Sequence, residues 1–318
     1  MDNFCHTLVG AAFGEAGLKR KTRFGNPTLM IAANLPDIDV LSFFTDTNPI
    51  SFRRGWTHGV YAQIALPVVF AAVMYAIGRL RPRRSDAGLA TSTAEGPPLH
   101  AGWLLLLSYI GVYSHVFLDF LNNYGVRVLA PVEWRWFYGD AVFIADVWLW
   151  LMLGLGVWLA RRQRRPVVAG GALVFASAYI AAMLLSAQAA RTVVTDTWRD
   201  VRGSAPRALM VGPAPFTPFT RVVIADAGDH YETGLFTWWP TAVSFDPEHI
   251  VKNTGHPLVK KARDQDPRIR EFLVWARFPF WTITPEKGGT RVSVGDVRFM
   301  SQSIRRANFQ ASTLVRDR

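Results

Sequence analysis

Among the histidine and aspartate side chains inside or beside the strongly apolar segments of this chain, six are candidate metal ligands. The six are His6, Asp37, Asp39, His58, His115 and Asp119. Ionisable side chains are costly within a membrane unless they pair, bind an ion or face water. Neutral imidazoles with carboxylates and no thiolate suit Zn²⁺, Mn²⁺ or Fe²⁺ in a site with open positions for water and substrate. We therefore expect a divalent metal site, with Zn²⁺ as the favoured ion.

Six candidate ligands are more than one tetrahedral ion needs. Two ions bridged by a carboxylate would suit them, and such a pair can clamp a phosphoryl oxygen and generate hydroxide near neutral pH. Each residue alone also has a simpler interpretation. A single membrane histidine can serve as a hydrogen bond between helices, and an aspartate at a helix end can serve as a cap. The combination of all six favours the metal cluster.

Local spacing supports this interpretation. His115 and Asp119 are four residues apart, so they share one face of a helix. His6, Gly10 and Gly14 also share a face at intervals of four. The two glycines would let a neighbouring helix approach closely, with His6 directed into the space between the helices.

Three further residues are candidates for catalytic roles. Asp146 or Asp140 would orient water or a ligand imidazole, although either aspartate could be a helix cap instead. Arg54 would hold an anionic substrate group through bidentate contacts. Arg53 and Arg54 could equally meet lipid headgroups, and the sequence leaves both readings open.

The elements that must position these residues are apolar runs. About 20 apolar residues are needed to cross a hydrocarbon core roughly 30 Å thick. Four runs meet this requirement, at 59–80, 101–121, 141–160 and 167–190. Two shorter membrane helices precede them, at 3–18 and 27–44. Pro36 should break the second, which allows Asp37 and Asp39 both to turn inward. The sequence thus predicts a membrane α-helical bundle over residues 1–190.

The cations indicate how this bundle is oriented. The chain has 318 residues with 35 Lys and Arg against 24 Asp and Glu, a net charge of +11. Of the 16 Lys and Arg in residues 1–190, 12 lie in clusters at 19–23, 79–84 and 161–165. Such clusters mark cytoplasmic loops, so the charge is a topology signal and nucleic acid is not an expected partner. This orientation brings all six candidate ligands to the outer face.

Residues 191–318 have a different character and predict a soluble outer domain of the α+β class. Segments at 221–226, 230–239, 272–284 and 290–299 are rich in β-branched and aromatic residues, and 246–272 reads as one or two short helices. A small antiparallel sheet with a helical insertion is expected. The histidines of this half, His230, His249 and His256, show no grouping in the sequence. The single cysteine, Cys5, excludes an internal disulfide.

Five motifs resemble the predicted membrane-bound metal-dependent hydrolases, a family of bacterial and archaeal inner-membrane proteins that includes the YdjM-like proteins. They are the glycine-spaced helix with His6, NLPDID at 34–39, RRGWTHG at 53–59, HVFLD at 115–119 and GDAVFIAD at 139–146. The resemblance covers about the first 160 residues. It implies metal-dependent hydrolysis at the membrane, with a logic similar to zinc-dependent phospholipase C sites. Arg53 stands where the family usually has histidine, so no ligand role is carried onto residue 53.

Two functions from different classes follow. The first is a hydrolase of the inner membrane whose site and C-terminal domain lie on the periplasmic side, acting on an ester or phosphoester of a lipid or lipid-linked molecule. The second is a metal-binding, sensing or ion-transporting protein without catalysis. A transporter is expected to carry polar residues in both halves of the bilayer and an internal repeat. Neither is visible, so we favour the enzyme. The oligomeric state stays open.

Overall fold

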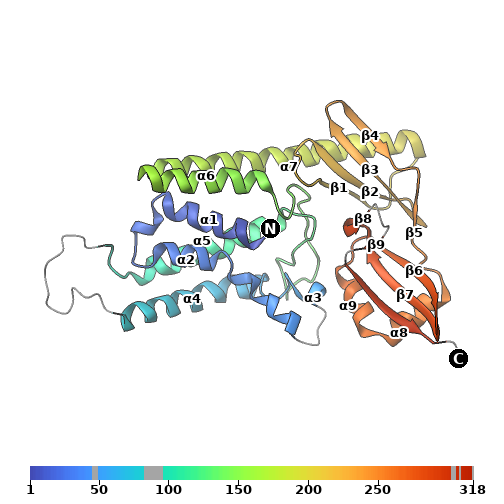
Figure 1. The fold of residues 1–318 in the computed structure, drawn as a ribbon, viewed down its shortest axis with the longest axis horizontal. Helices are drawn as coiled ribbons and strands as arrows, with labels where there is room; N and C mark the ends of the chain where they lie inside the picture. Colours follow the sequence, from blue (N-terminus) through green and yellow to red (C-terminus); the bar gives the residue numbers. More distant parts are fainter. Residues whose placement is uncertain (45–48, 82–95, 302–305, 308, 317–318) are drawn as a thin grey trace. The chain divides into compact units, whose positions relative to one another are not determined.

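The computed structural model describes residues 1–44, 49–81, 96–301, 306–307 and 309–316 (Figure 1). The chain divides into two units. The first comprises Met1–Asp39 and Arg54–Leu184, and the second comprises Val40–Arg53 and Leu185–Arg318. The first unit is helical, while the second carries the β-strands. A helical N-terminal half and a C-terminal β-sheet domain are therefore confirmed.

The helices that lie wholly or partly in the first unit follow one another in sequence order. They are α1 (Asn3–Glu15), η1 (Leu18–Arg20), α2 (Gly25–Ala32), η2 (Leu35–Phe44), α4 (Val60–Leu80), α5 (Ala101–Phe120), α6 (Val147–Gln163) and α7 (Pro166–Arg202). The ends of η2 and α7 belong to the second unit. Within the described residues, α4, α5 and α7 are long and apolar enough to cross a membrane. Three of the four predicted spans thus have a matching helix.

The remaining predicted span, 141–160, begins later than expected. The Asp146 carboxylate accepts hydrogen bonds from the backbone nitrogens of Trp148 at 3.1 Å and Leu149 at 3.0 Å. Such a cap satisfies amide groups that lack an intrahelical partner, so it fixes where a helix starts. Helix α6 therefore begins at Val147 and has 17 residues. The prediction of a helix from residue 141 was wrong, because residues 141–146 form the loop before this cap.

The first two helices are short. Helix α1 has 13 residues and α2 has 8. At 1.5 Å per residue they measure roughly 20 Å and 12 Å, less than the roughly 30 Å of a hydrocarbon core. Regular α-helix stops at Ala32, and Pro36 lies in η2, which is a 3₁₀ helix. The predicted break at Pro36 is confirmed.

Glycines allow α2 to approach both α1 and α5. A Cβ at Gly10 would lie 2.8 Å from the Leu29 carbonyl oxygen, and a Cβ at Gly111 would lie 2.8 Å from the Ala33 nitrogen. These are closer than real Cβ contacts, so only glycine fits there. The close approach expected for the glycine face of α1 is confirmed.

The basic clusters gather at one end of the first unit. Arg161 on α6 pairs with Glu15 at the end of α1 at 2.8 Å, and Lys19 contacts the same carboxylate. Arg23 lies 3.5 Å from the carbonyl of Gly78 near the end of α4. His6 lies near the start of α1, at the opposite end from Glu15, and His115 and Asp119 lie near the end of α5.

The second unit contains two main sheets, where one was expected. In the first, β1 (Leu209–Pro213), β2 (Thr220–Asp226), β3 (His230–Trp238) and β4 (Thr241–Phe245) lie in that order, and β5 (Ile250–Val251) also pairs with β3. The second has the order β10 (Gln310–Val315), β7 (Gly289–Asp296) and β6 (Pro279–Glu286). A short pair joins β8 (Met300–Ser301) and β9 (Arg306–Ala307). The remaining elements are α3 (Pro49–Phe52), α8 (Pro257–Gln265), α9 (Pro267–Trp275) and η4 (Val297–Phe299).

Two element boundaries differ from the sequence-based expectation. Residues 272–275 end α9, so the predicted strand 272–284 begins only at Pro279; Phe272 and Trp275 are both fully buried on one helical face. Helix α7 continues to Arg202, past the expected domain start at 191. It does so because Val194 and Trp198, four residues apart, pack in the core of the first sheet.

Candidate metal centre

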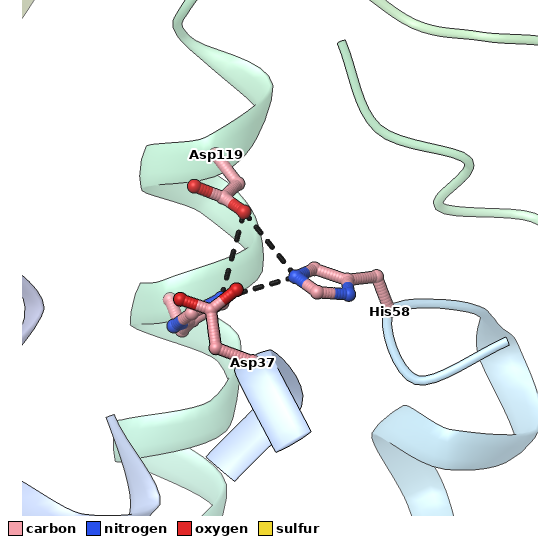
Figure 2. A group of neighbouring side chains, drawn as sticks. Asp37, His58 and Asp119 are labelled. Atoms are coloured by element: carbon pink, nitrogen blue, oxygen red, sulfur yellow. Dashed lines mark hydrogen bonds and ion pairs between the residues drawn. The ribbon is translucent and has the colours of Figure 1, made fainter. Parts of the chain in front are cut away.

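Four buried side chains converge in the first unit (Figure 2). Asp37 comes from η2, His58 from the loop before α4, and His115 and Asp119 from successive turns of α5. One ligand atom from each lies within 4.8 Å of the others. We call Asp37, His58, His115 and Asp119 the four-residue group. The spacing of four on α5 therefore does place two of them on one inward face.

The contacts inside the group are close. His58 Nε2 lies 3.2 Å from Asp119 Oδ2 and 3.1 Å from His115 Nε2. His115 Nε2 lies 3.5 Å from Asp119 Oδ2 and 3.9 Å from Asp37 Oδ1. Two imidazole nitrogens and two carboxylate oxygens thus face a common point, the donor set that Zn²⁺, Mn²⁺ and Fe²⁺ accept.

The outer nitrogen of each ring is held as a hydrogen-bond donor. His115 Nδ1 lies 2.8 Å from the Ala33 carbonyl oxygen, which can only accept. For His58, the Thr57 hydroxyl donates its single hydrogen to Asp39 at 2.9 Å, so it accepts from His58 Nδ1 at 3.0 Å. In the neutral rings both Nε2 atoms therefore present lone pairs to each other. A cation between them would relieve that repulsion.

Asp39 lies behind His58 instead of beside the other ligands. Its Oδ2 atom is 3.5 Å from His58 Nδ1 and accepts from the Arg54 backbone nitrogen at 2.8 Å. A carboxylate that fixes the tautomer and direction of a ligating imidazole is a recurrent feature of metal sites. This geometry gives Asp39, together with Thr57, an orienting position, although the sequence placed it among the ligands.

His6 borders the four-residue group. Its ring stacks on the His115 ring with centroids 3.8 Å apart and an interplanar angle of 21°. Its Nε2 lies 3.4 Å from Asp119 Oδ1. Neither ring nitrogen makes a hydrogen bond within the described part of the chain, although the ring is fully buried. Buried polar atoms normally have a partner, so an ion or water beside His6 would complete its contacts.

Arg54 contacts the group directly. Its Nε atom lies 2.9 Å from Asp119 Oδ2, and Nη1 donates to Asn122 at 3.0 Å. The Met1 amine contacts the other oxygen of Asp119. Arg54 is buried, so these contacts direct its guanidinium to Asp119. A substrate anion would have to share the guanidinium with that carboxylate.

The other two predicted catalytic residues lie apart from the group. Asp146 caps α6 and accepts a hydrogen bond from the Tyr179 hydroxyl at 3.0 Å. Asp140 lies in the loop between α5 and α6 with a left-handed backbone, φ 49°. The structure brings neither carboxylate into the four-residue group.

A cavity of about 490 Å³ reaches the group beside Asp37. Besides Asp37, the polar lining residues are Asn3, Thr7 and Asn34, and the rest of the lining is apolar. The apolar lining residues are Met30, Ile31, Leu35 and Ile38. An apolar group could therefore lie next to the Asp37 carboxylate.

A second group was missed by sequence reasoning. His230, Glu232 and His249 bring three further ligand atoms within 4.8 Å of one another in the second unit. These histidines show no grouping in the sequence, but the structure brings His230 and His249 together. The one sign of this group in the sequence is that His230 and Glu232 are two residues apart in a predicted strand, so they share a face. His249 joins them only through the pairing of β5 with β3.

These observations define a class: a protein with apolar helices of membrane-spanning length and a buried group of His and Asp side chains, two of them on one of these helices. Residues 1–190 match the family described as YdjM inner membrane protein, and the chain belongs to this family. The resemblance to the YdjM-like proteins inferred from the motifs is thereby confirmed. The family name and the three apolar helices fit a place in the inner membrane. The four-residue group lies wholly within the matched residues.

One curated relative covers nearly the whole chain. It is the protein named "Uncharacterized protein YfhP" of Bacillus subtilis (strain 168), 20% identical over 319 residues. The match covers 95% of this chain and 88% of the relative, so it includes the C-terminal half that lies outside the family match. No solved structure matches the chain significantly.

Proposed function

We propose that this protein is a membrane-embedded metal-dependent hydrolase. One observation carries the proposal. Two imidazole rings, each with its outer nitrogen held as a donor, direct their Nε2 atoms toward two carboxylate oxygens at one buried point. Asp37, His58, His115 and Asp119 would hold a divalent ion, Zn²⁺ being favoured. When bound, the ion would polarise an ester or phosphoester oxygen and acidify water.

The residues around the group would each have a defined task. Ala33, Thr57 and Asp39 keep the two imidazoles in the tautomer that presents Nε2 inward. Arg54 holds Asp119 in place. His6, with no hydrogen bond at either ring nitrogen among the described residues, would accept a proton from water. In a site with two ions, His6 would instead be a ligand, together with the other Asp119 oxygen 3.4 Å away.

The substrate class follows from location and lining. The cavity beside Asp37 is mostly apolar, which favours a lipid or lipid-linked ester or phosphoester over a free polar metabolite. The basic clusters at the opposite end of the unit favour a cytoplasmic position for that end, so the site would open on the periplasmic side.

Metal content tests the site. Elemental analysis of the detergent-purified protein should find about one divalent ion per chain at the site formed by these four ligands. His58→Ala and His115→Ala should each remove it. His100→Asn is the matched control, because His100 caps α5 at its other end and asparagine can also cap. Equal, negligible metal in wild type and both variants would overturn the proposal.

Turnover separates the enzyme from a binding protein. The metal-loaded protein, incubated with a broad lipid extract, should release headgroups or diacylglycerol, and His58→Ala should not. Metal bound stoichiometrically with no lipid changed across the panel would instead support a non-catalytic metal-binding, sensing or ion-transport role.

A further inference from the structure

The C-terminal unit carries its own cluster of metal-ligating side chains. His230 and Glu232 lie two residues apart on β3, so they share one face of that strand. The register pairs His230 with Val251 and Tyr231 with Ile250, and its continuation places His249, the residue before β5, opposite Glu232. Cross-strand neighbours meet on one face of a sheet. The strand pairing therefore assembles the three side chains.

The hydrogen bonds around His230 leave its inner nitrogen as an acceptor. Nδ1 lies 2.6 Å from Asp229 Oδ1, and a carboxylate can only accept, so Nδ1 carries the hydrogen. In the neutral ring, Nε2 then presents a lone pair 3.6 Å from Glu232 Oε1. The two acceptors cannot hydrogen-bond to each other. Asp229 thus lies beside Nδ1 of His230, as Asp39 lies beside Nδ1 of His58.

Glu232 is held firmly while keeping capacity for another partner. Arg202, the last residue of α7, donates Nε to Oε1 at 3.0 Å and Nη2 to Oε2 at 2.8 Å. A carboxylate has about four lone-pair positions, so this bidentate contact leaves room for a cation on the remaining ones. The Glu232 carboxylate is buried, whereas His249 is exposed with its ring 4.6 Å from that of His230.

The cluster opens into a cavity of about 630 Å³. His230, Glu232 and His249 are part of its lining, together with Arg202 and Arg207. Three protein ligands leave coordination positions of an ion open, and here those positions would face the cavity. The two arginines would attract a small anion such as a carboxylate or phosphate to them.

We propose that His230, Glu232 and His249 form a second divalent metal site, of the two-histidine, one-carboxylate type with open positions. Zn²⁺ is the favoured ion, since imidazole and carboxylate ligands suit it. Asp229 positions His230, and Arg202 positions Glu232. The site lies outside the residues that match the family, and it does not depend on the proposed hydrolase activity.

Zinc uptake by the full-length protein tests the proposal. After equilibration with Zn²⁺ in detergent, elemental analysis should find about one ion less per chain in His249→Ala than in wild type. His256→Ala is the matched control, because His256 is also exposed in the same unit but belongs to neither cluster. It should bind as much zinc as wild type.

A background variant keeps this result separate from the first site. In His58→Ala, His249→Ala should still remove about one further ion, whatever the first group binds. Zn²⁺ should also raise the melting temperature of His256→Ala more than that of His249→Ala, since an ion that binds only the folded state stabilises it. Equal zinc uptake by His249→Ala and His256→Ala would overturn the proposal.

Discussion

His58 Nε2 and His115 Nε2 lie 3.1 Å apart, and the other nitrogen of each ring is held by a separate neighbour. His115 uses the Ala33 carbonyl, while His58 uses Thr57 and Asp39. The inward direction of both lone pairs thus depends on residues that do not face the common point. The first two predictions test this dependence.

Asp39→Asn should weaken metal binding without abolishing it. Asparagine can place its amide nitrogen toward His58 Nδ1 and favour the wrong tautomer. Loss of such an orienting partner lowers metal affinity by about 10- to 100-fold. Competition with a chelator measures the change. Asp140→Asn is the control, since Asp140 lies outside the four-residue group and asparagine tolerates its left-handed backbone. Identical affinities for Asp39→Asn and Asp140→Asn would contradict the orienting role.

Gly111→Leu should disturb the same centre from a distance. A Cβ at Gly111 would lie 2.8 Å from the Ala33 nitrogen, so α2 must move away from α5. That movement takes the Ala33 carbonyl away from His115 Nδ1. We expect reduced metal content and a loss of about 1–3 kcal/mol of stability, as for other overpacked sites.

Gly171→Leu on α7 is the matched control for this change, because a Cβ there has no atom within 4 Å. It should keep both metal content and melting temperature. Should Gly111→Leu retain full metal content, the close contact of α2 with α5 would not be what positions His115.

Acid should weaken the C-terminal unit through Asp266. Arg268 donates to this carboxylate at 3.1 and 2.7 Å and holds the pKa of Asp266 below its usual value. A lowered folded pKa adds stability above the unfolded value, about 3.9, and that stability is lost as the pH falls through the folded value. Arg268 is largely exposed, so the contribution is small.

Thermal unfolding of wild type and Asp266→Asn between neutral and acidic pH checks this. The melting temperatures should differ at neutral pH and converge in acid, because asparagine does not titrate. A difference that stays constant with pH would show that Asp266 contributes only as the cap of α9.

Reporter fusions test the orientation. A fusion after residue 90 should report the cytoplasm, since the loop after α4 follows a basic cluster, and a fusion after residue 310 should report the periplasm. An insertion of the same reporter after residue 163, at the basic end of α6, should match the fusion at 90. A cytoplasmic signal at residue 310 would reverse the proposed topology.

Several parts of the site could be predicted from local rules. The spacing of His115 and Asp119 puts both on one face of α5, and Pro36 ends regular helix before Asp37. Repeats of 3.6 residues and the missing amide of proline act within a few residues, so they can be read from the sequence. The prediction that a strand begins at residue 272 was wrong, because burial on one face of α9 outweighed the β preference of Phe272 and Trp275.

The sequence by itself determined which residues are out of place in an apolar segment, and at which end of the helices they gather. It did so through charge and hydropathy, which act on any chain in a bilayer. Only the tertiary structure separated Asp37, which faces His115, from Asp39, which lies behind His58. It alone joined His249 to His230 and Glu232 through strand pairing. Both outcomes depend on contacts between distant segments, and the direction of a side chain there is set by its packing partners.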